Sequence, residues 1–160
     1  MRIDASGGFH YDESETTILS DGTMTKRSRA REVALQLLFQ RDLNPAVDRT
    51  FIEKFAGNRI LDATLVPFCL SLFDGVVAGG EDIDQRLSAA ADNWRLPRMA
   101  AVDRNVLRLG AYELLSTPET PASVVINEAI ELARRYGSAD SPSFVNGVLD
   151  KLRLTFTPPT

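Results

Sequence analysis

The chain has 160 residues, of which 44% are hydrophobic and 25% charged, the proportions of a soluble globular protein. A chain of this length can bury one hydrophobic core without stabilising disulfides or metal ions. Its single cysteine, Cys69, and single histidine, His10, exclude an internal disulfide, a multi-cysteine metal site and any site built on two imidazoles. No apolar run approaches the ~18–20 residues that cross a bilayer, and no secretory signal is visible, so we expect a cytoplasmic protein.

The net charge of −4 is concentrated at the N-terminus. Residues 1–23 contain five acids and one base, whereas the other 17 bases and 17 acids of the chain balance. Within that neutral body, residues 26–41 carry five bases against Glu32 alone, a local charge of +4. A neutral domain with one concentrated basic stretch favours a local anion site over a general nucleic-acid coat.

Residues 1–24 are expected to be a disordered acidic extension, and residues 25–157 a single folded domain. The extension contains Gly7-Gly8 and the cluster Asp12-Glu13-Ser14-Glu15, and it shows no helical or strand period of useful length. Such a segment buries too little apolar surface to repay the entropy of ordering it.

Apolar residues recur with helical spacing through the rest of the chain. The first stripe starts near residue 25 and ends before Asn44-Pro45, because a residue that precedes proline disfavours the helical conformation. The spacing predicts further helices over Asp48–Phe55, 62–78, Glu81–Asp92, 102–115, 125–133 and 141–152. No segment alternates apolar and polar residues between hairpin turns. We therefore predict an all-α fold of about seven helices.

Local signals refine three of these helices. Gly57-Asn58 closes the second, and Gly137 ends the sixth. On the wet side of the sixth helix, Glu131 and Arg135 are spaced for an i,i+4 pair. Ser141-Pro142 starts the seventh, as a serine N-cap followed by proline at the first helical position.

No residue pattern indicates an enzyme. Cys69 lies inside the most apolar predicted helix, where a buried thiol is unreactive, so we interpret it as a packing residue. Glu81, Asp82 and Asp84 lie at a helix start, where acids interact favourably with the helix dipole. Gly-rich nucleotide loops need a preceding strand, and none is predicted. We expect no catalytic residue, no cofactor and no metal.

Two segments suggest anion binding, each with a purely structural alternative. Four cations fall in the expected first turn of the first helix: Lys26, Arg27, Arg29 and Arg31. There, cations and unsatisfied N–H groups can converge on a phosphate backbone, or the cations are simply a solvated charged end. The polar loop 137–147 carries Phe144, which either stacks on an RNA base or packs in the core with Val148.

Three ordered parts of the sequence carry a resemblance to a known family. They are Arg29-Ala-Arg-Glu-Val-Ala-Leu-Gln-Leu-Leu-Phe39, then Val102-Asp-Arg-Asn-Val-Leu-Arg-Leu-Gly-Ala-Tyr-Glu-Leu114, and then Ile126-Asn-Glu-Ala-Ile-Glu-Leu-Ala133 with Phe144-Val-Asn-Gly-Val-Leu-Asp-Lys151. Together they resemble the NusB family of transcription antitermination factors, over about residues 25–153.

The resemblance implies an all-helical fold of two packed helical subdomains without catalytic function. It also implies binding of the boxA element of nascent RNA as a heterodimer with NusE, which is also a small-subunit ribosomal protein. That complex would join RNA polymerase and suppress premature termination, chiefly on ribosomal RNA operons. By position, the RNA-binding residues are Arg27, Arg29, Arg31, Asp140 and Phe144, and the NusE-facing residues are Phe39 and Asp103. The local positive charge adds Lys26 to the expected RNA-binding residues.

Two other functions stay open at this stage. The chain is also compatible with the helical N-terminal domain of an rRNA cytosine methyltransferase, which requires it to be a fragment of an enzyme. It is further compatible with a helical adaptor that binds only protein, in which the basic stretch is merely solvated. An exposed helix face can serve a homodimer or a NusE contact equally well.

Overall fold

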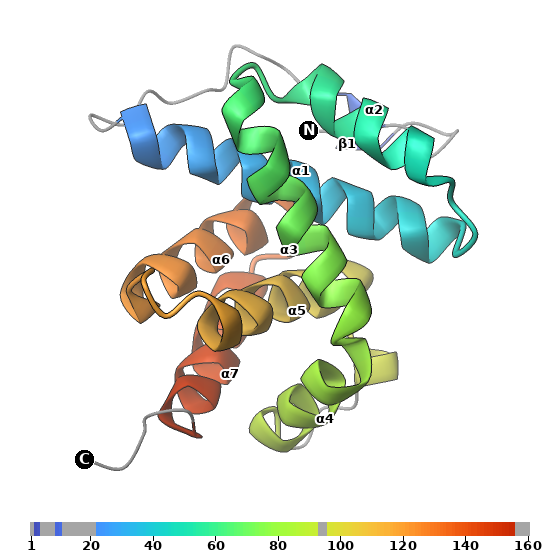
Figure 1. The fold of residues 1–160 in the computed structure, drawn as a ribbon. Coiled ribbons are helices and arrows are strands. Elements are labelled where there is room, and N and C mark those ends of the chain that lie inside the picture. Colours follow the sequence, from blue (N-terminus) through green and yellow to red (C-terminus); the bar gives the residue numbers. More distant parts are fainter. Residues whose placement is uncertain (1, 4–8, 11–21, 93–95, 156–160) are drawn as a thin grey trace. The chain divides into compact units, whose positions relative to one another are not determined.

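The computed structural model describes residues 2–3, 9–10, 22–92 and 96–155, and these residues are mostly helical (Figure 1). The α-helices of the described part are α1 (Gly22–Leu43), α2 (Arg49–Arg59), α3 (Val66–Ala78), α4 (Gly80–Ala90), α5 (Ala101–Ser116), α6 (Ala122–Tyr136) and α7 (Ser141–Thr155). Two 3₁₀ turns, η2 (Ala63–Leu65) and η3 (Leu96–Arg98), precede α3 and α5. The all-α prediction is confirmed.

The N-terminal extension differs from the prediction in two places. Two short strands, β1 (Arg2–Ile3) and β2 (Phe9–His10), pair antiparallel, although no strand was predicted. A strand of two residues is too short to leave a period in the sequence. In addition, α1 begins at Gly22 rather than near residue 25, because glycine and threonine in its first turn are weak helix formers and hide the boundary. The rest of the predicted extension, 1, 4–8 and 11–21, lies outside the described residues.

The chain divides into two compact units, Met1–Cys69 and Leu70–Thr160. In the first, α2 returns alongside α1 as a helical hairpin (Figure 1). The N-cap of α2 is Asp48, whose side chain accepts from the N–H of Thr50, at the predicted start of this helix.

Helix α2 is longer than predicted. It continues through Gly57 and Asn58 to Arg59, and its C-cap is Ile60, whose N–H donates to the carbonyl of Ala56. A Cβ at Gly57 would meet nothing within 4 Å, so this glycine neither ends the helix nor permits a close approach. Glycine in a helix costs only about 1 kcal/mol relative to alanine, a cost that the surrounding helix tolerates.

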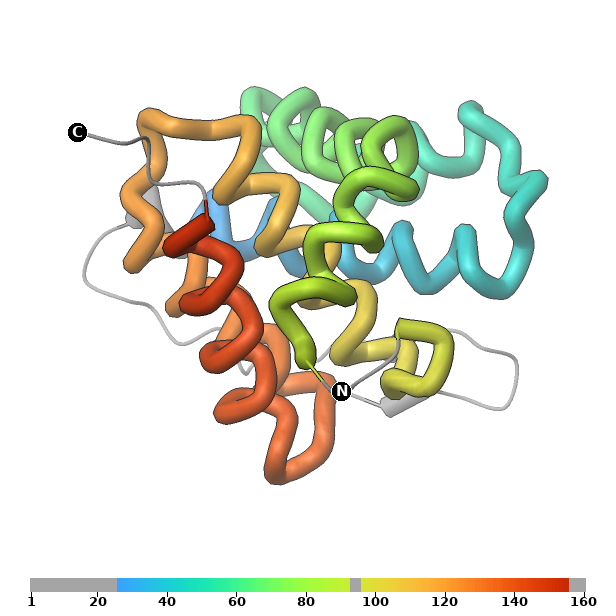
Figure 2. Tube along the Cα trace, turned by 90° about the horizontal axis from the view of Figure 1, so that it is seen from below, coloured from blue at the N-terminus to red at the C-terminus, as the bar shows by residue number. Residues whose placement is uncertain are grey.

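In the second unit, α5 contacts α4, α6 and α7 (Figures 1 and 2). Two glycines permit close approaches there. A Cβ on Gly110 of α5 would lie 2.8 Å from Cδ1 of Leu149 on α7. A Cβ on Gly75 of α3 would lie 2.0 Å from the ring of Tyr112 on α5, so the tyrosine ring rests directly on the helix backbone.

The turn between α6 and α7 contains two corrections. Glu131 pairs with Arg134, one residue before the predicted Arg135. Ser141 is the first residue of α7 rather than its N-cap, and its buried hydroxyl accepts from the N–H of Ser138 at 3.0 Å. Gly137 is the C-cap of α6, as predicted, and a Cβ there would lie 2.4 Å from the Ser141 hydroxyl oxygen.

Candidate nucleic-acid interface

The basic stretch of α1 lies inside the helix and not at its start. Because α1 begins at Gly22, Lys26 is its fifth residue and Arg31 its tenth. The N–H groups that a helix leaves without partners belong to its first four residues. The expected convergence of helix-start N–H groups with all four cations is therefore wrong, and any anion site here depends on side chains.

Lys26 and Arg29, three residues apart and thus on one face of α1, reach the end of α2 and the segment just after it. The ammonium of Lys26 lies 3.3 Å from the Asp62 carboxylate, and the Lys26 side chain is 60% exposed. Arg29 donates from Nε to the carbonyl of Arg59 at 3.1 Å and from Nη1 to Glu32 at 2.5 Å. Arg29 is thus held at both ends of its guanidinium, next to the end of α2.

Arg27 and Arg31, four residues apart, both lie over the ring of Phe68 in the first turn of α3. Their guanidinium carbons are 5.1 and 5.4 Å from the ring centroid, within the range of a cation–π interaction. Arg27 is exposed, whereas Arg31 is only 3% exposed. We refer to Lys26, Arg27, Arg29, Arg31 and Phe68 together as the basic cluster. Phe68 was not predicted to belong to it, because the apolar sequence around it indicates only a buried helix.

Asp62 is the acid that pairs with Lys26 of the basic cluster. Its carboxylate accepts from the N–H and the hydroxyl of Thr64, at 3.0 and 2.6 Å, and caps η2. These hydrogen bonds, and after them the Lys26 charge, lower the pKa of Asp62 below its ordinary value of 3.8. Asp62 therefore carries its full negative charge beside Lys26 at neutral pH.

The second predicted RNA-facing segment lies at the start of α7, in the other unit. Asp140 is exposed, and its carbonyl accepts from the N–H of Phe144 at 3.1 Å. Phe144 itself is half-buried, so its ring is neither a core residue nor fully open to solvent. A half-buried ring of this kind can pack against the protein with one face and leave the other face accessible to a ligand.

The two predicted NusE-facing residues have different environments. Phe39 on α1 is buried, at 9% exposure. Asp103 in the first turn of α5 is half-buried, and within the described part of the chain its Oδ1 atom is buried without a hydrogen-bond partner.

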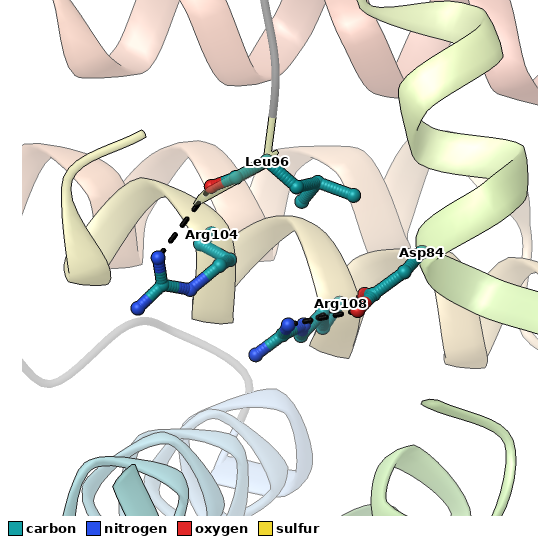
Figure 3. A network of polar contacts seen from close by, with 4 residues as sticks. All are labelled: Asp84, Leu96, Arg104 and Arg108. Atoms are coloured by element: carbon teal, nitrogen blue, oxygen red, sulfur yellow. Dashed lines mark hydrogen bonds and ion pairs between the residues drawn. The ribbon is translucent and has the colours of Figure 1, made fainter. Parts of the chain in front are cut away.

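Two arginines that follow Asp103 on α5 fix this helix by polar contacts. Arg104 donates to the carbonyl of Leu96 in η3 at 3.4 Å, and Arg108 forms two 2.8 Å contacts with Asp84 on α4 (Figure 3). The two Arg108 contacts are the fork geometry that fixes an arginine against a carboxylate. The helix that carries Asp103 is thus tied to α4 and to η3, the two elements that precede it in the chain.

Other chemistry finds no support in the described residues. Cys69 is completely buried, which confirms the interpretation as a packing residue. Among residues 22–92 and 96–155, no cluster of histidine, cysteine and acidic side chains is arranged to hold a metal ion. In the same ranges no single helix is long and apolar enough to cross a membrane. Residues Ala63–Ala78 and Gly80–Ala90 reach that length and apolar content only together, and the chain bends by 77° between them.

A sequence profile of the NusB family matches residues 28–153. The chain belongs to the NusB family. It is 47% identical over 137 residues to the transcription antitermination protein NusB of Sorangium cellulosum, covering 81% of this chain and 92% of that protein. The names of such relatives denote a transcription factor, which agrees with the expectation that the chain is not an enzyme and disagrees with the methyltransferase alternative.

Solved structures show the same fold. The NusB of T. maritima superimposes with a TM-score of 0.73 at 36% identity, covering 82% of this chain and 93% of that one. A crystal structure of the antitermination factors NusB and NusE in complex with double-stranded RNA superimposes with a TM-score of 0.74 at 25% identity. That match covers 83% of this chain and 99% of the solved one.

Proposed function

We propose that this protein is a transcription antitermination factor that binds boxA-type single-stranded RNA together with NusE. It would act as part of an RNA polymerase elongation complex in the cytoplasm and suppress premature termination, chiefly on ribosomal RNA operons. Family membership supports the antitermination role, and the related NusB crystallised with NusE and RNA supports both partners.

The basic cluster is the observation that carries the RNA contact. It contains two exposed cations, Lys26 and Arg27, and Arg27 lies over the half-buried ring of Phe68, so it combines phosphate neutralisation with an aromatic surface. In this proposal Lys26, Arg27 and Arg29 face the RNA backbone. Arg31, which is buried, acts through the position of the Phe68 ring.

The remaining predicted residues complete the proposal. The half-buried Phe144 would supply a second ring on which an RNA base stacks, and the exposed Asp140 would lie next to the RNA backbone. For NusE we propose a direct contact with Asp103, because its buried Oδ1 atom accepts no hydrogen bond within the described chain and a partner donor would satisfy it. Phe39 on α1, being buried, would support the NusE-facing part of α1 from within, and a homodimer would compete with NusE for exposed surface.

The test is a titration of boxA-type single-stranded RNA, with and without NusE, against a double variant, Lys26→Ala with Arg27→Ala. Loss of two phosphate contacts should weaken binding and reduce the slope of log affinity against log salt by about 0.7 per contact on a single strand. The matched control is Arg134→Ala with Arg153→Ala, which removes two exposed helix arginines from the other unit at the same cost in net charge.

Three results are informative. Weaker binding and a smaller slope in the Lys26/Arg27 variant, with the control unchanged, supports the proposal. Equal slopes in the two variants would place the RNA elsewhere. A wild-type protein that binds NusE but neither single-stranded nor duplex RNA would instead be the protein-only adaptor.

A further inference from the structure

Arg59, the last residue of α2, is an arginine that the sequence pattern did not single out. Its guanidinium carbon lies only 3.6 Å from the centroid of the Phe55 ring, so the guanidinium rests against the face of a buried aromatic side chain. Arg59 is half-buried in this position. An arginine supported in this way keeps its edge N–H donors directed away from the ring.

Those donors have no acceptor among the residues that the structure describes. Within residues 22–92 and 96–155, no carboxylate pairs with the Arg59 guanidinium and no carbonyl accepts a hydrogen bond from it. Arg29, by contrast, has both Glu32 and the Arg59 carbonyl as acceptors. Within the described part of the chain, Arg29, the cation that sequence analysis selected, therefore has acceptors for its donors, and the adjacent Arg59 has none.

Arg59 is also continuous with the basic cluster. Arg29 hydrogen-bonds to its backbone, and Lys26 pairs with Asp62 three residues further on. Burial, and after it the neighbouring Arg29 charge, lowers the pKa of Arg59 from its ordinary value, although arginine remains protonated at neutral pH. Two arginines held this close raise the local positive potential, which an arriving anion would relieve.

We propose that Arg59 is a further phosphate-binding residue of the RNA surface, which extends from α1 onto the end of α2. This inference rests on the proposed function. A guanidinium edge matches two oxygens of a phosphate, and the Phe55 ring fixes its plane before RNA arrives. Arg59 lies 28 residues beyond Arg31 in a segment of ordinary charge, so only the fold associates it with the cluster.

The experiment compares Arg59→Gln and Arg59→Lys in the full chain, with boxA-type single-stranded RNA over a range of salt concentrations. Arg59→Gln should reduce the salt slope by about 0.7, which corresponds to about a fivefold weaker binding for each decade of salt below 1 M. Arg59→Lys keeps the charge and should retain most of the slope. The Arg29 bond to residue 59 uses a backbone carbonyl and survives both changes.

The control is Arg49→Gln, at the other end of the same helix, where the arginine already pairs with Glu53 at 3.3 Å. Its slope should equal that of the wild type, and melting curves check that all variants fold. A wild type that binds RNA while Arg59→Gln binds it with an unchanged slope overturns this inference and leaves the proposed function intact. A lysine variant that loses as much slope as glutamine also overturns it, since charge would then not be the cause. A wild type that binds no RNA overturns both.

Discussion

Asp62 and Asp48 are two aspartates with the same local role and different neighbours. Each caps a helical turn by accepting from the N–H of a threonine two residues on, Thr64 and Thr50. Only Asp62 also holds a cation of the basic cluster, because Lys26 lies 3.3 Å away. An RNA phosphate that approaches Lys26 must therefore compete with a carboxylate that is already there.

Replacing that carboxylate should strengthen RNA binding. In Asp62→Asn the amide oxygen can still cap η2, whereas Lys26 loses its counter-ion, so we expect affinity to rise about two- to fivefold, the range of exposed ion pairs. Asp48→Asn is the matched control and should leave affinity unchanged. The measurement is the same RNA titration at low salt, and an equal gain in both variants would show that total charge, and not Asp62, is responsible.

The same variant tests the pH dependence. Because the pKa of Asp62 is lowered on folding, its charge stabilises the folded state at all pH values above about its ordinary 3.8. That stabilisation is lost as the pH falls below this value through the lower pKa of the folded protein. Melting temperatures between pH 2 and pH 7 should therefore fall less steeply in acid for Asp62→Asn than for the wild type.

Residue-level sequence analysis found the basic cluster but not the roles within it. A charge count locates Lys26 and Arg31 equally well, yet one side chain is 60% exposed and the other residue 3%. Exposure depends on how α1 meets the chain around Asp62 and Phe68, more than 30 residues away, and the sequence has no local signal for that contact. Arg59 was missed for the same reason.

Within the elements, glycines show where close packing decides stability. Gly75→Ala should destabilise the protein by about 1–3 kcal/mol, because the new Cβ would overlap the rigid Tyr112 ring, and this overpacking exceeds the propensity gain of alanine. Gly147→Ala on α7 is the control, since a Cβ there meets nothing within 4 Å and should stabilise by about 0.5–1 kcal/mol. Denaturant unfolding measures the change in the free energy of unfolding for each variant. A Gly75→Ala variant that is more stable than the wild type would contradict the close packing of Tyr112.

Helix boundaries were predicted well where proline or an N-cap sets them and poorly where tertiary contacts do. Asn44-Pro45 and Asp48 fix the end of α1 and the start of α2 at the expected residues. Gly57-Asn58 is typical of a helix end, yet α2 continues to Arg59, whose carbonyl receives a hydrogen bond from Arg29. That contact stabilises the last turn and has no counterpart in the local sequence.

At the scale of the whole molecule, the fold class follows from the sequence and the division into units does not. Periodic apolar stripes show which face of each helix is buried but not which helix covers it, so two subdomains were expected only from the family resemblance. The structure divides at Cys69, inside α3, a position that no loop or composition change marks.

The acidic extension supplies a test at this scale. A variant that lacks residues 2–21 keeps α1 from Gly22 onward and removes the whole −4 of the chain. We expect an unchanged melting temperature, and RNA binding that is equal or slightly stronger at low salt because a competing negative charge is gone. Loss of cooperative melting would mean that the extension belongs to the folded domain.

The two acceptors of Arg29 also have a consequence for the speed of binding. A long side chain that is already fixed by Glu32 and by the end of α2 loses little rotational freedom when a ligand arrives. In the proposed RNA complex, Arg29 would therefore need no slow rearrangement, and diffusion under electrostatic attraction would set the rate at which this contact forms. The protein would capture a short-lived RNA segment at first encounter, and differences between RNA sequences would be expressed in how long each remains bound.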